Sequence, residues 1–175
     1  MAGYVIHIII AEEYIRKHKI KDKEEFIKGT IYPDSVKIKG TTHYSPYYSS
    51  DTDLYKFLLD KKLDNSYNLG YFLHLLVDVL FYNKYFILPR EDGIAEKVHN
   101  DYDILNKRLQ EKYNPTLPEE IKKYTKCIEG KLEILDENKI YQCIDEASNY
   151  DLIELGKRIL KERDYKKILG TLKWE

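Results

Sequence analysis

Residues 69–82, LGYFLHLLVDVLFY, form the most apolar stretch of the chain, and they place His74 and Asp78 four residues apart. Positions i and i+4 share one face of a helix. Because the flanking residues are apolar nearly all round, we expect this helix to be buried. A buried carboxylate is costly unless it is paired or binds a metal, so the pair needs partners from elsewhere in the chain.

The composition indicates one all-α domain. The 175 residues fit a single domain, glycine and proline are scarce at 8 and 5 residues, and apolar side chains recur at helical spacing. The formal net charge of -1 gives no global basic field that would indicate nucleic acid as a partner. Two cysteines, Cys127 and Cys143, favour free thiols in a reducing compartment. The apolar N-terminal stretch lacks the basic start of a signal peptide and is too short to span a bilayer, so we expect a cytoplasmic protein.

We expect residues 1–175 to form one helical bundle in which residues 64–86 are the buried central helix. Residues 30–50, with Pro33, Gly40 and Pro46, are expected to form a long irregular loop, and such loops are often functional. The C-terminal helices within residues 117–170 carry no histidine and are expected only to pack. Further helices are expected at residues 3–18, 22–29, 51–62, 91–113, 136–148 and 151–163. The Asp22-x-x-Glu25 pattern of a capping box predicts the start of the second of these, and Gly29 predicts its end.

Several other histidines and aspartates lie where they could partner His74 and Asp78. Each alone is more often a core residue, a turn or a solvated face than a metal ligand, but imidazole and carboxylate together suit Zn, Fe or Mn. Ligands on separate helices converge in the core of helical-bundle metal sites. We therefore expect a metal site within residues 3–105. The candidate ligands are His7, Asp34, His43, His74, Asp78, His99 and Asp103.

The order of these residues resembles the zinc-dependent phospholipase C and P1-type nuclease superfamily. The resemblance rests on His7, on residues 29–34 read as Gly-x-x-x-Pro-Asp, on Thr42-His43 and on residues 74–78 read as His-x-x-x-Asp. It covers about residues 3–105 and implies an all-helical fold whose metal cluster hydrolyses phosphoesters. It implies that His43, His74 and Asp78 are metal ligands.

The resemblance also implies roles for the remaining candidates. His7 matches a ligand of a neighbouring metal that Asp78 would bridge, and Asp34 matches an acid that serves as ligand or general base. His99 and Asp103 match a later His-x-x-x-acid pair, with aspartate in place of glutamate. Members carry another histidine where this chain has Lys84, and secreted members use a processed N-terminus as a ligand. We therefore expect one or two divalent ions, with Zn preferred and Fe, Mn or Ni as alternatives.

These features predict a metal-dependent phosphoester hydrolase in which Asp34 orients or deprotonates water. Substrate contacts are expected from the loop side chains Lys37, Lys39, Tyr44, Tyr47 and Tyr48. One alternative is a helical protein that binds a metal or ligand without turnover. The other is an HD-type phosphohydrolase, although the chain has no adjacent His-Asp dipeptide. The substrate and the oligomeric state stay open.

Overall fold

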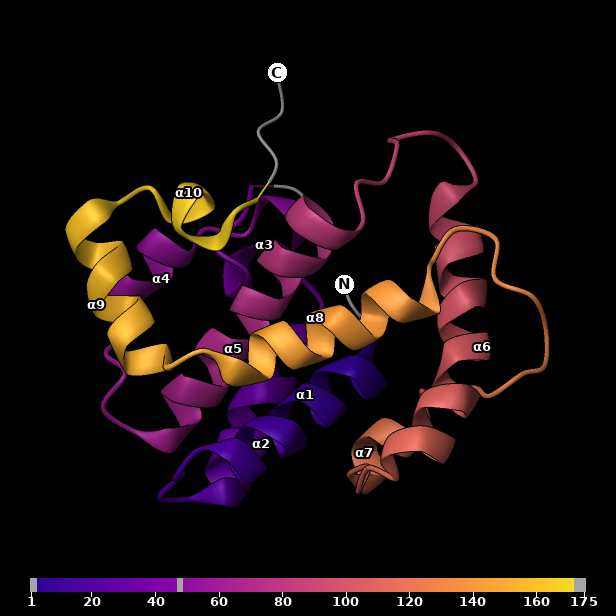
Figure 1. The fold of residues 1–175 in the computed structure, drawn as a ribbon, viewed down its shortest axis with the longest axis horizontal. Coiled ribbons are helices and arrows are strands. Elements are labelled where there is room, and N and C mark those ends of the chain that lie inside the picture. The colour runs from indigo at the N-terminus through magenta and orange to yellow at the C-terminus, as the bar shows by residue number, and fades with distance from the viewer. Residues whose placement is uncertain (1–2, 47–48, 172–175) are drawn as a thin grey trace.

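Helix α5, Ser66–Leu80, lies at the centre of the computed structural model, with α1, Tyr4–Lys17, and α2, Lys23–Ile31, packed beside it (Figure 1). The structure describes residues 3–46 and 49–171. Within those ranges every regular element is a helix, so the predicted all-α class is confirmed.

Helix α5 is the buried helix that the apolar stretch predicted. Its N-cap is Asn65, whose side chain accepts a hydrogen bond of 2.8 Å from the amide of Asn68. Every residue from Gly70 to Leu80 is buried. Full burial of one Leu, Val or Phe side chain contributes about 1.5–3 kcal/mol, so this helix contributes a large share of the core stability. It continues into a wider π-helical turn, η3, Phe81–Tyr85.

Two glycines let α2 and α5 approach each other closely. A Cβ atom on Gly29 would lie 2.0 Å from the carbonyl oxygen of Tyr67, and one on Gly70 would lie 1.9 Å from that of Phe26. Real Cβ contacts are never this short, so both positions require glycine. The expected helix end near Gly29 is therefore wrong: α2 passes through Gly29 to Ile31, because this glycine provides close packing and not a cap.

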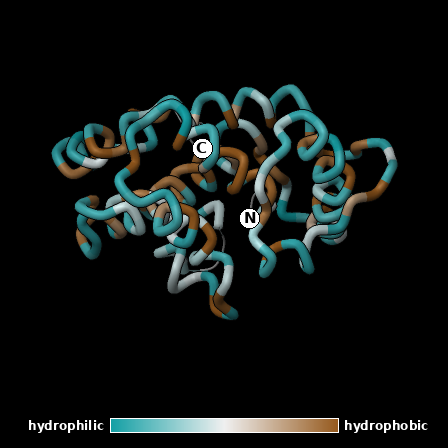
Figure 2. Tube along the Cα trace, turned by 90° about the horizontal axis from the view of Figure 1, so that it is seen from below, coloured by the Kyte–Doolittle hydropathy of each residue, from teal (hydrophilic) through white to brown (hydrophobic). Residues whose placement is uncertain are grey.

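The remaining helices surround this centre. Helix α8 crosses α1, α4 packs beside α9, and α6 lies at one end of the molecule (Figure 1). Apolar residues concentrate toward the middle of the trace, and hydrophilic residues lie mostly toward the outside (Figure 2). The bounds are α4 Leu54–Asp60, α6 Ile94–Tyr113, α7 Glu119–Lys122, α8 Glu137–Asn149, α9 Leu152–Glu162 and α10 Tyr165–Leu169.

The expectation of one irregular loop over residues 30–50 is wrong where the structure describes it. Three short helices occupy the segment: η1 Tyr32–Asp34, α3 Lys39–Thr42 and η2 Ser49–Asp51. Pro33 is the physical reason for the first, because its fixed φ suits the opening turn of a helix and lets α2 continue into η1. The prolines and glycine that signalled a loop thus mark boundaries between short helices.

Two other boundaries shift for local reasons. Helix α6 begins at Ile94, not at residue 91, because Gly93 before it has a φ of 84°. Helix α4 begins at Leu54, where the Asp53 side chain accepts a hydrogen bond from the amide of Lys56. Cys143 is buried and Cys127 exposed, and both are free thiols. In the described ranges, no helix is both long enough and apolar enough to cross a bilayer.

Candidate metal centre

Five of the predicted side chains meet in the core, although they come from four different elements. His7 lies on α1, Asp34 ends η1, His43 follows α3, and His74 and Asp78 lie on successive turns of α5. As whole residues, they are 2%, 4%, 1%, 1% and 0% exposed in that order. Burial of this many polar side chains at one point requires that they neutralise one another or share a cation.

The distances between their polar atoms fit the spacing of ligands around one ion. The Nε2 atom of His43 lies 3.2 Å from Nε2 of His74, 3.1 Å from Asp78 Oδ2 and 3.5 Å from Asp34 Oδ1. His74 Nε2 lies 3.5 Å from Asp78 Oδ2 and 3.8 Å from Asp34 Oδ2, and His7 Nε2 lies 3.4 Å from Asp78 Oδ1. Tetrahedral Zn with bonds of about 2.0–2.2 Å separates its ligand atoms by roughly 3.3–3.6 Å.

Backbone carbonyls fix the orientation of two imidazoles. His74 Nδ1 donates to the carbonyl oxygen of Thr30 at 2.7 Å, and His43 Nδ1 donates to that of Lys39 at 2.8 Å. A carbonyl only accepts, so both Nδ1 atoms carry the proton, and each Nε2 of a neutral ring presents a lone pair to the centre. Metal-binding histidines are commonly held in this way. Two facing lone pairs repel each other unless a proton or a cation lies between them.

Other polar atoms of the centre lack hydrogen bonds from the described residues. Both carboxylate oxygens of Asp34 and the Nδ1 atom of His7 make none, and Lys39 Nζ approaches Asp34 Oδ1 only to 3.5 Å. Each buried polar group left without a hydrogen bond costs about 1–3 kcal/mol. Imidazole nitrogens and carboxylate oxygens in this state are the donors that a divalent transition metal takes, so the residues fit such an ion.

Burial and charge set the protonation of the centre in the absence of an ion. Burial, helped by the nearby His74, lowers the pKa of His7 to about 4 and leaves that ring neutral. Burial also opposes charge on His74, but Asp34 and Asp78 outweigh it and raise the pKa of His74. Burial disfavours the charged carboxylate of Asp78, yet nearby positive charge and the contacts with His43, His7 and His74 hold its pKa well below its usual range. In the absence of an ion, the raised pKa of His74 favours a proton on this ring, where it offsets the negative charge of Asp34 and Asp78.

Two overlapping groups could each hold a metal ion: His7 with His74 and Asp78, and Asp34 with His43 and His74. All five residues are buried, and ligand atoms within each group lie within 4.8 Å of one another. His74 belongs to both groups, so the centre has donors for one ion or for two adjacent ions.

The structure does not bring His99 and Asp103 into either group. Both lie on α6, where His99 is exposed and Asp103 is half-buried. Lys84, which the resemblance would align with a further histidine of the superfamily, makes its contacts away from the centre. Its Nζ pairs with Glu146 at 2.7 Å and donates to the carbonyl oxygen of Leu169 at 3.2 Å, on the side of α8 and α10.

The loop side chains expected at a substrate are spread apart. Lys39 lies at the centre, Lys37 is exposed, and the Tyr44 hydroxyl donates to Asp60 at 2.5 Å. Tyr47 and Tyr48 lie outside the described residues.

The sequence analysis did not single out three polar residues that the structure shows in or beside the core. Tyr82 and Tyr102 share a hydrogen bond of 3.3 Å beside the centre, and Tyr82 could have been found because it follows Asp78 by four residues. Asp101, 0% exposed, accepts hydrogen bonds from the amides of residues 133–135 at 2.7–3.2 Å. Those amides explain the burial of Asp101, which therefore holds a loop and not an ion.

Two cavities each include one residue of the centre in their lining. One, of about 560 Å³, is lined by His43, and the other, of about 550 Å³, is lined by Asp34. His99 and Tyr102 line both. The centre is therefore buried but has room for small molecules within the 300–1,000 Å³ typical of ligand sites.

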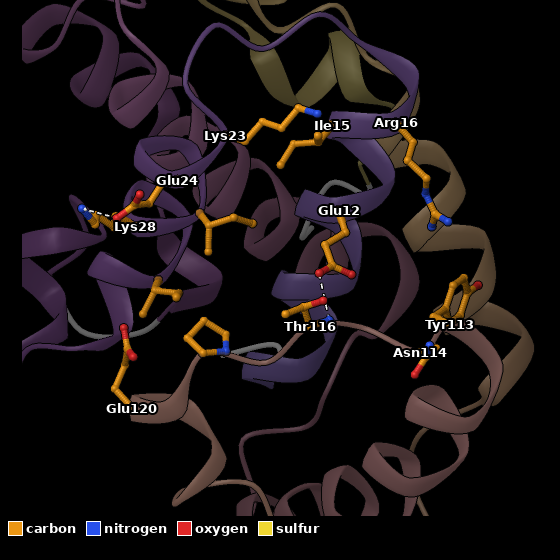
Figure 3. Close-up of a pocket in the computed structure, with 13 residues that line it drawn as sticks. Glu12, Ile15, Arg16, Lys23, Glu24, Lys28, Tyr113, Asn114, Thr116 and Glu120 are labelled. Carbon is orange, nitrogen blue, oxygen red and sulfur yellow. Dashed lines mark hydrogen bonds and ion pairs between the residues drawn. The ribbon is translucent and has the colours of Figure 1, made fainter.

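A third cavity, of about 620 Å³, lies away from the centre between α1, α2 and the segment around Thr116 (Figure 3). Several of its polar groups pair with one another: the Glu12 carboxylate accepts from the Thr116 amide at 2.9 Å, and Lys28 pairs with Glu24 at 3.1 Å. None of the five core residues lines it. Size alone does not make it the functional site.

Comparison of the chain with protein-family models, with curated proteins and with solved structures finds no match. The resemblance to the zinc-dependent phospholipase C and P1-type nuclease superfamily therefore stays a prediction. The geometry of the centre has to support the function by itself.

Proposed function

We propose that this chain is a metal-dependent phosphoester hydrolase with a centre of one or two divalent ions. One observation carries the proposal: the Nε2 lone pairs of His43 and His74 face the carboxylates of Asp34 and Asp78 at ligand spacing in a buried site. The proposed ligands are His7, Asp34, His43, His74 and Asp78. Zn is the preferred ion, with Fe, Mn or Ni as alternatives.

A divalent ion held there supplies Lewis-acid polarisation of a phosphoryl oxygen and activates water near neutral pH. The chain contributes the rest. Thr30 and Lys39 hold two imidazoles through their backbone carbonyls, so the ligands are oriented before an ion arrives. Asp34, whose oxygens accept no hydrogen bond from the described residues, is placed to orient water or take its proton.

Metal content and hydrolysis, measured on the same protein, test the proposal. After purification in metal-supplemented medium we expect about one or two ions per chain and turnover of bis(p-nitrophenyl) phosphate or p-nitrophenyl phosphate. His43→Ala should lose both. His18→Ala is the matched control, because His18 binds the carbonyl oxygen of Ser148 outside the centre.

The two measurements separate the alternatives. Bound metal without turnover of either ester favours the non-catalytic metal-binding protein. A chain that takes up no Zn, Fe, Mn or Ni and hydrolyses neither ester contradicts the proposal altogether.

A further inference from the structure

The cavity beside His43 and the cavity beside Asp34 have nearly the same volume, about 560 and 550 Å³, and three carboxylates line each of them. Asp51, Glu91 and Asp92 line the first, and Asp34, Asp103 and Glu120 line the second. The cations are Lys39 and Arg90 in the first cavity and Lys123 in the second. Because neither size nor the number of carboxylates distinguishes the cavities, the position of their cations decides which one suits an anion.

Lys39 stands at the inner end of the first cavity. Its Nζ lies 3.5 Å from Asp34 Oδ1, the same oxygen that His43 Nε2 approaches to 3.5 Å. Its side chain is 37% exposed whereas that of Asp34 is 0% exposed, so the lysine joins the buried centre to the open cavity. Asp34 and Asp78 balance one divalent ion, so the ammonium of Lys39 adds positive charge beside the loaded centre.

The side walls of this cavity combine hydroxyl groups with apolar surface. The hydroxyls of Tyr82 and Tyr102 share a hydrogen bond of 3.3 Å, and burial raises the pKa of both, so they stay protonated as donors. Leu88 and Val98 add apolar area. At the outer rim Arg90 is 70% exposed and pairs with Asp51 at 3.4 Å, where solvent screens the charges.

We propose that this cavity, and not the one beside Asp34, binds the phosphoester, with its phosphate against Lys39 and a compact apolar organic group against Tyr82, Tyr102 and Val98. The inference rests on the proposed function and specifies its substrate class. The cavity beside Asp34 suits a phosphate dianion less well, because among the described residues its cation, Lys123, makes no ion pair with a carboxylate of the centre, whereas Lys39 does.

Binding of two probes to the zinc-loaded full-length protein tests the inference by calorimetry. Phenylphosphonate should bind about tenfold more tightly than inorganic phosphate, because only its ring contacts the apolar walls. Lys39→Gln should weaken both probes about tenfold, as expected for loss of a charge-assisted contact. Ala95→Trp, which fills the cavity from its lining, should weaken phenylphosphonate and spare phosphate.

Lys123→Gln is the matched control, because it removes a lysine from the other cavity and should leave both affinities unchanged. Zinc content measured alongside confirms that Lys39→Gln keeps the centre, since the backbone carbonyl that holds His43 is retained. The inference is overturned if Lys123→Gln weakens the probes and Lys39→Gln does not, or if zinc-loaded protein binds neither probe.

The outcomes for the two proposals are distinct. Lys39-dependent binding of phenylphosphonate without hydrolysis of any ester supports the cavity assignment and removes the proposed function. If Lys39→Gln changes neither the rate of ester hydrolysis nor the affinity for phenylphosphonate, only the cavity assignment is overturned. A chain that takes up no Zn, Fe, Mn or Ni, hydrolyses neither ester and binds neither probe overturns both.

Discussion

Two helices of this protein carry the same His-x-x-x-Asp spacing, and the structure treats them in opposite ways. His74 and Asp78 on α5 are 1% and 0% exposed and meet three other polar side chains. His99 on α6 is exposed, Asp103 is half-buried, and neither belongs to a group that could hold a metal ion. The spacing places both side chains of each pair on one helix face, but only α5 has facing elements that supply further ligands.

The difference lies in what the rest of each helix does. Apolar residues surround His74 and Asp78, so burial of α5 carries the two polar groups into the core. Helix α6 is polar on its outer face and lies at one end of the molecule (Figure 1). A carboxylate in the core must find partners, whereas one at the surface is satisfied by water. Because burial of a polar group is costly, the His74–Asp78 pair indicates that further polar partners lie nearby in the fold.

Asp78→Asn should produce the largest effect on metal binding. The amide keeps the shape and loses the charge, so helix α5 should still form while metal affinity falls more than about 100-fold, beyond the 10–100-fold typical of outer partners. Asp103→Asn is the matched change on α6 and should leave metal content unaltered. Metal analysis and circular dichroism check both variants. Equal loss of metal from the two would abolish the distinction between the helices.

Gly70→Ala should destabilise the fold by about 3 kcal/mol or more, because the new Cβ would lie 1.9 Å from the Phe26 carbonyl and push α2 away. The same shift should weaken metal binding, since α2 supplies the carbonyl of Thr30 to His74. Gly93→Ala before α6 has open space and only a positive φ, so about 1–2 kcal/mol is expected. Urea unfolding measures both. A smaller loss for Gly70→Ala than for Gly93→Ala would show that close packing of α2 on α5 is not critical.

Metal affinity should fall as pH falls, by up to about tenfold per pH unit for each proton displaced. Because the pKa of His74 is raised, His74 in the metal-free protein keeps its proton to a higher pH than an ordinary histidine does. Its stabilisation of the metal-free fold is complete below the unfolded pKa of about 6.5 and is lost as pH rises through the folded value. Calorimetry in buffers of different ionisation enthalpy detects the released proton. His99→Ala should leave the proton release unchanged, and a release that disappears in this variant would assign the proton to α6.

His99→Ala should have the smallest effect. An exposed side chain outside both ligand groups is expected to change stability by no more than about 0.5 kcal/mol. Metal content should also stay at the wild-type level, in contrast to His74→Ala. Loss of an ion from His99→Ala would instead indicate a second metal site that includes α6.

Local sequence patterns predicted much of the fold because the physics behind them is local. The apolar run around His74 predicted a buried helix, and Asp22, the start of an Asp-x-x-Glu pattern, caps α2 through the amide of Glu25. The short helices of residues 30–50 were missed, because Pro33 is compatible with both a turn and a helix start. Gly29 was misread for a similar reason, since a glycine that ends a helix and one that permits close packing look alike in the sequence.

The sequence by itself determined that His74 and Asp78 would be buried on one helix face, and it supplied the other side chains that such a pair needs. Only the tertiary structure decided which of them meet. It brought His7, Asp34 and His43 to the pair and left His99 and Asp103 outside both groups. The deciding contact is between α2 and α5, where two glycines let the carbonyl of Thr30 reach His74. Helix periodicity is set by neighbours along the chain, whereas the meeting of four segments depends on how their surfaces pack.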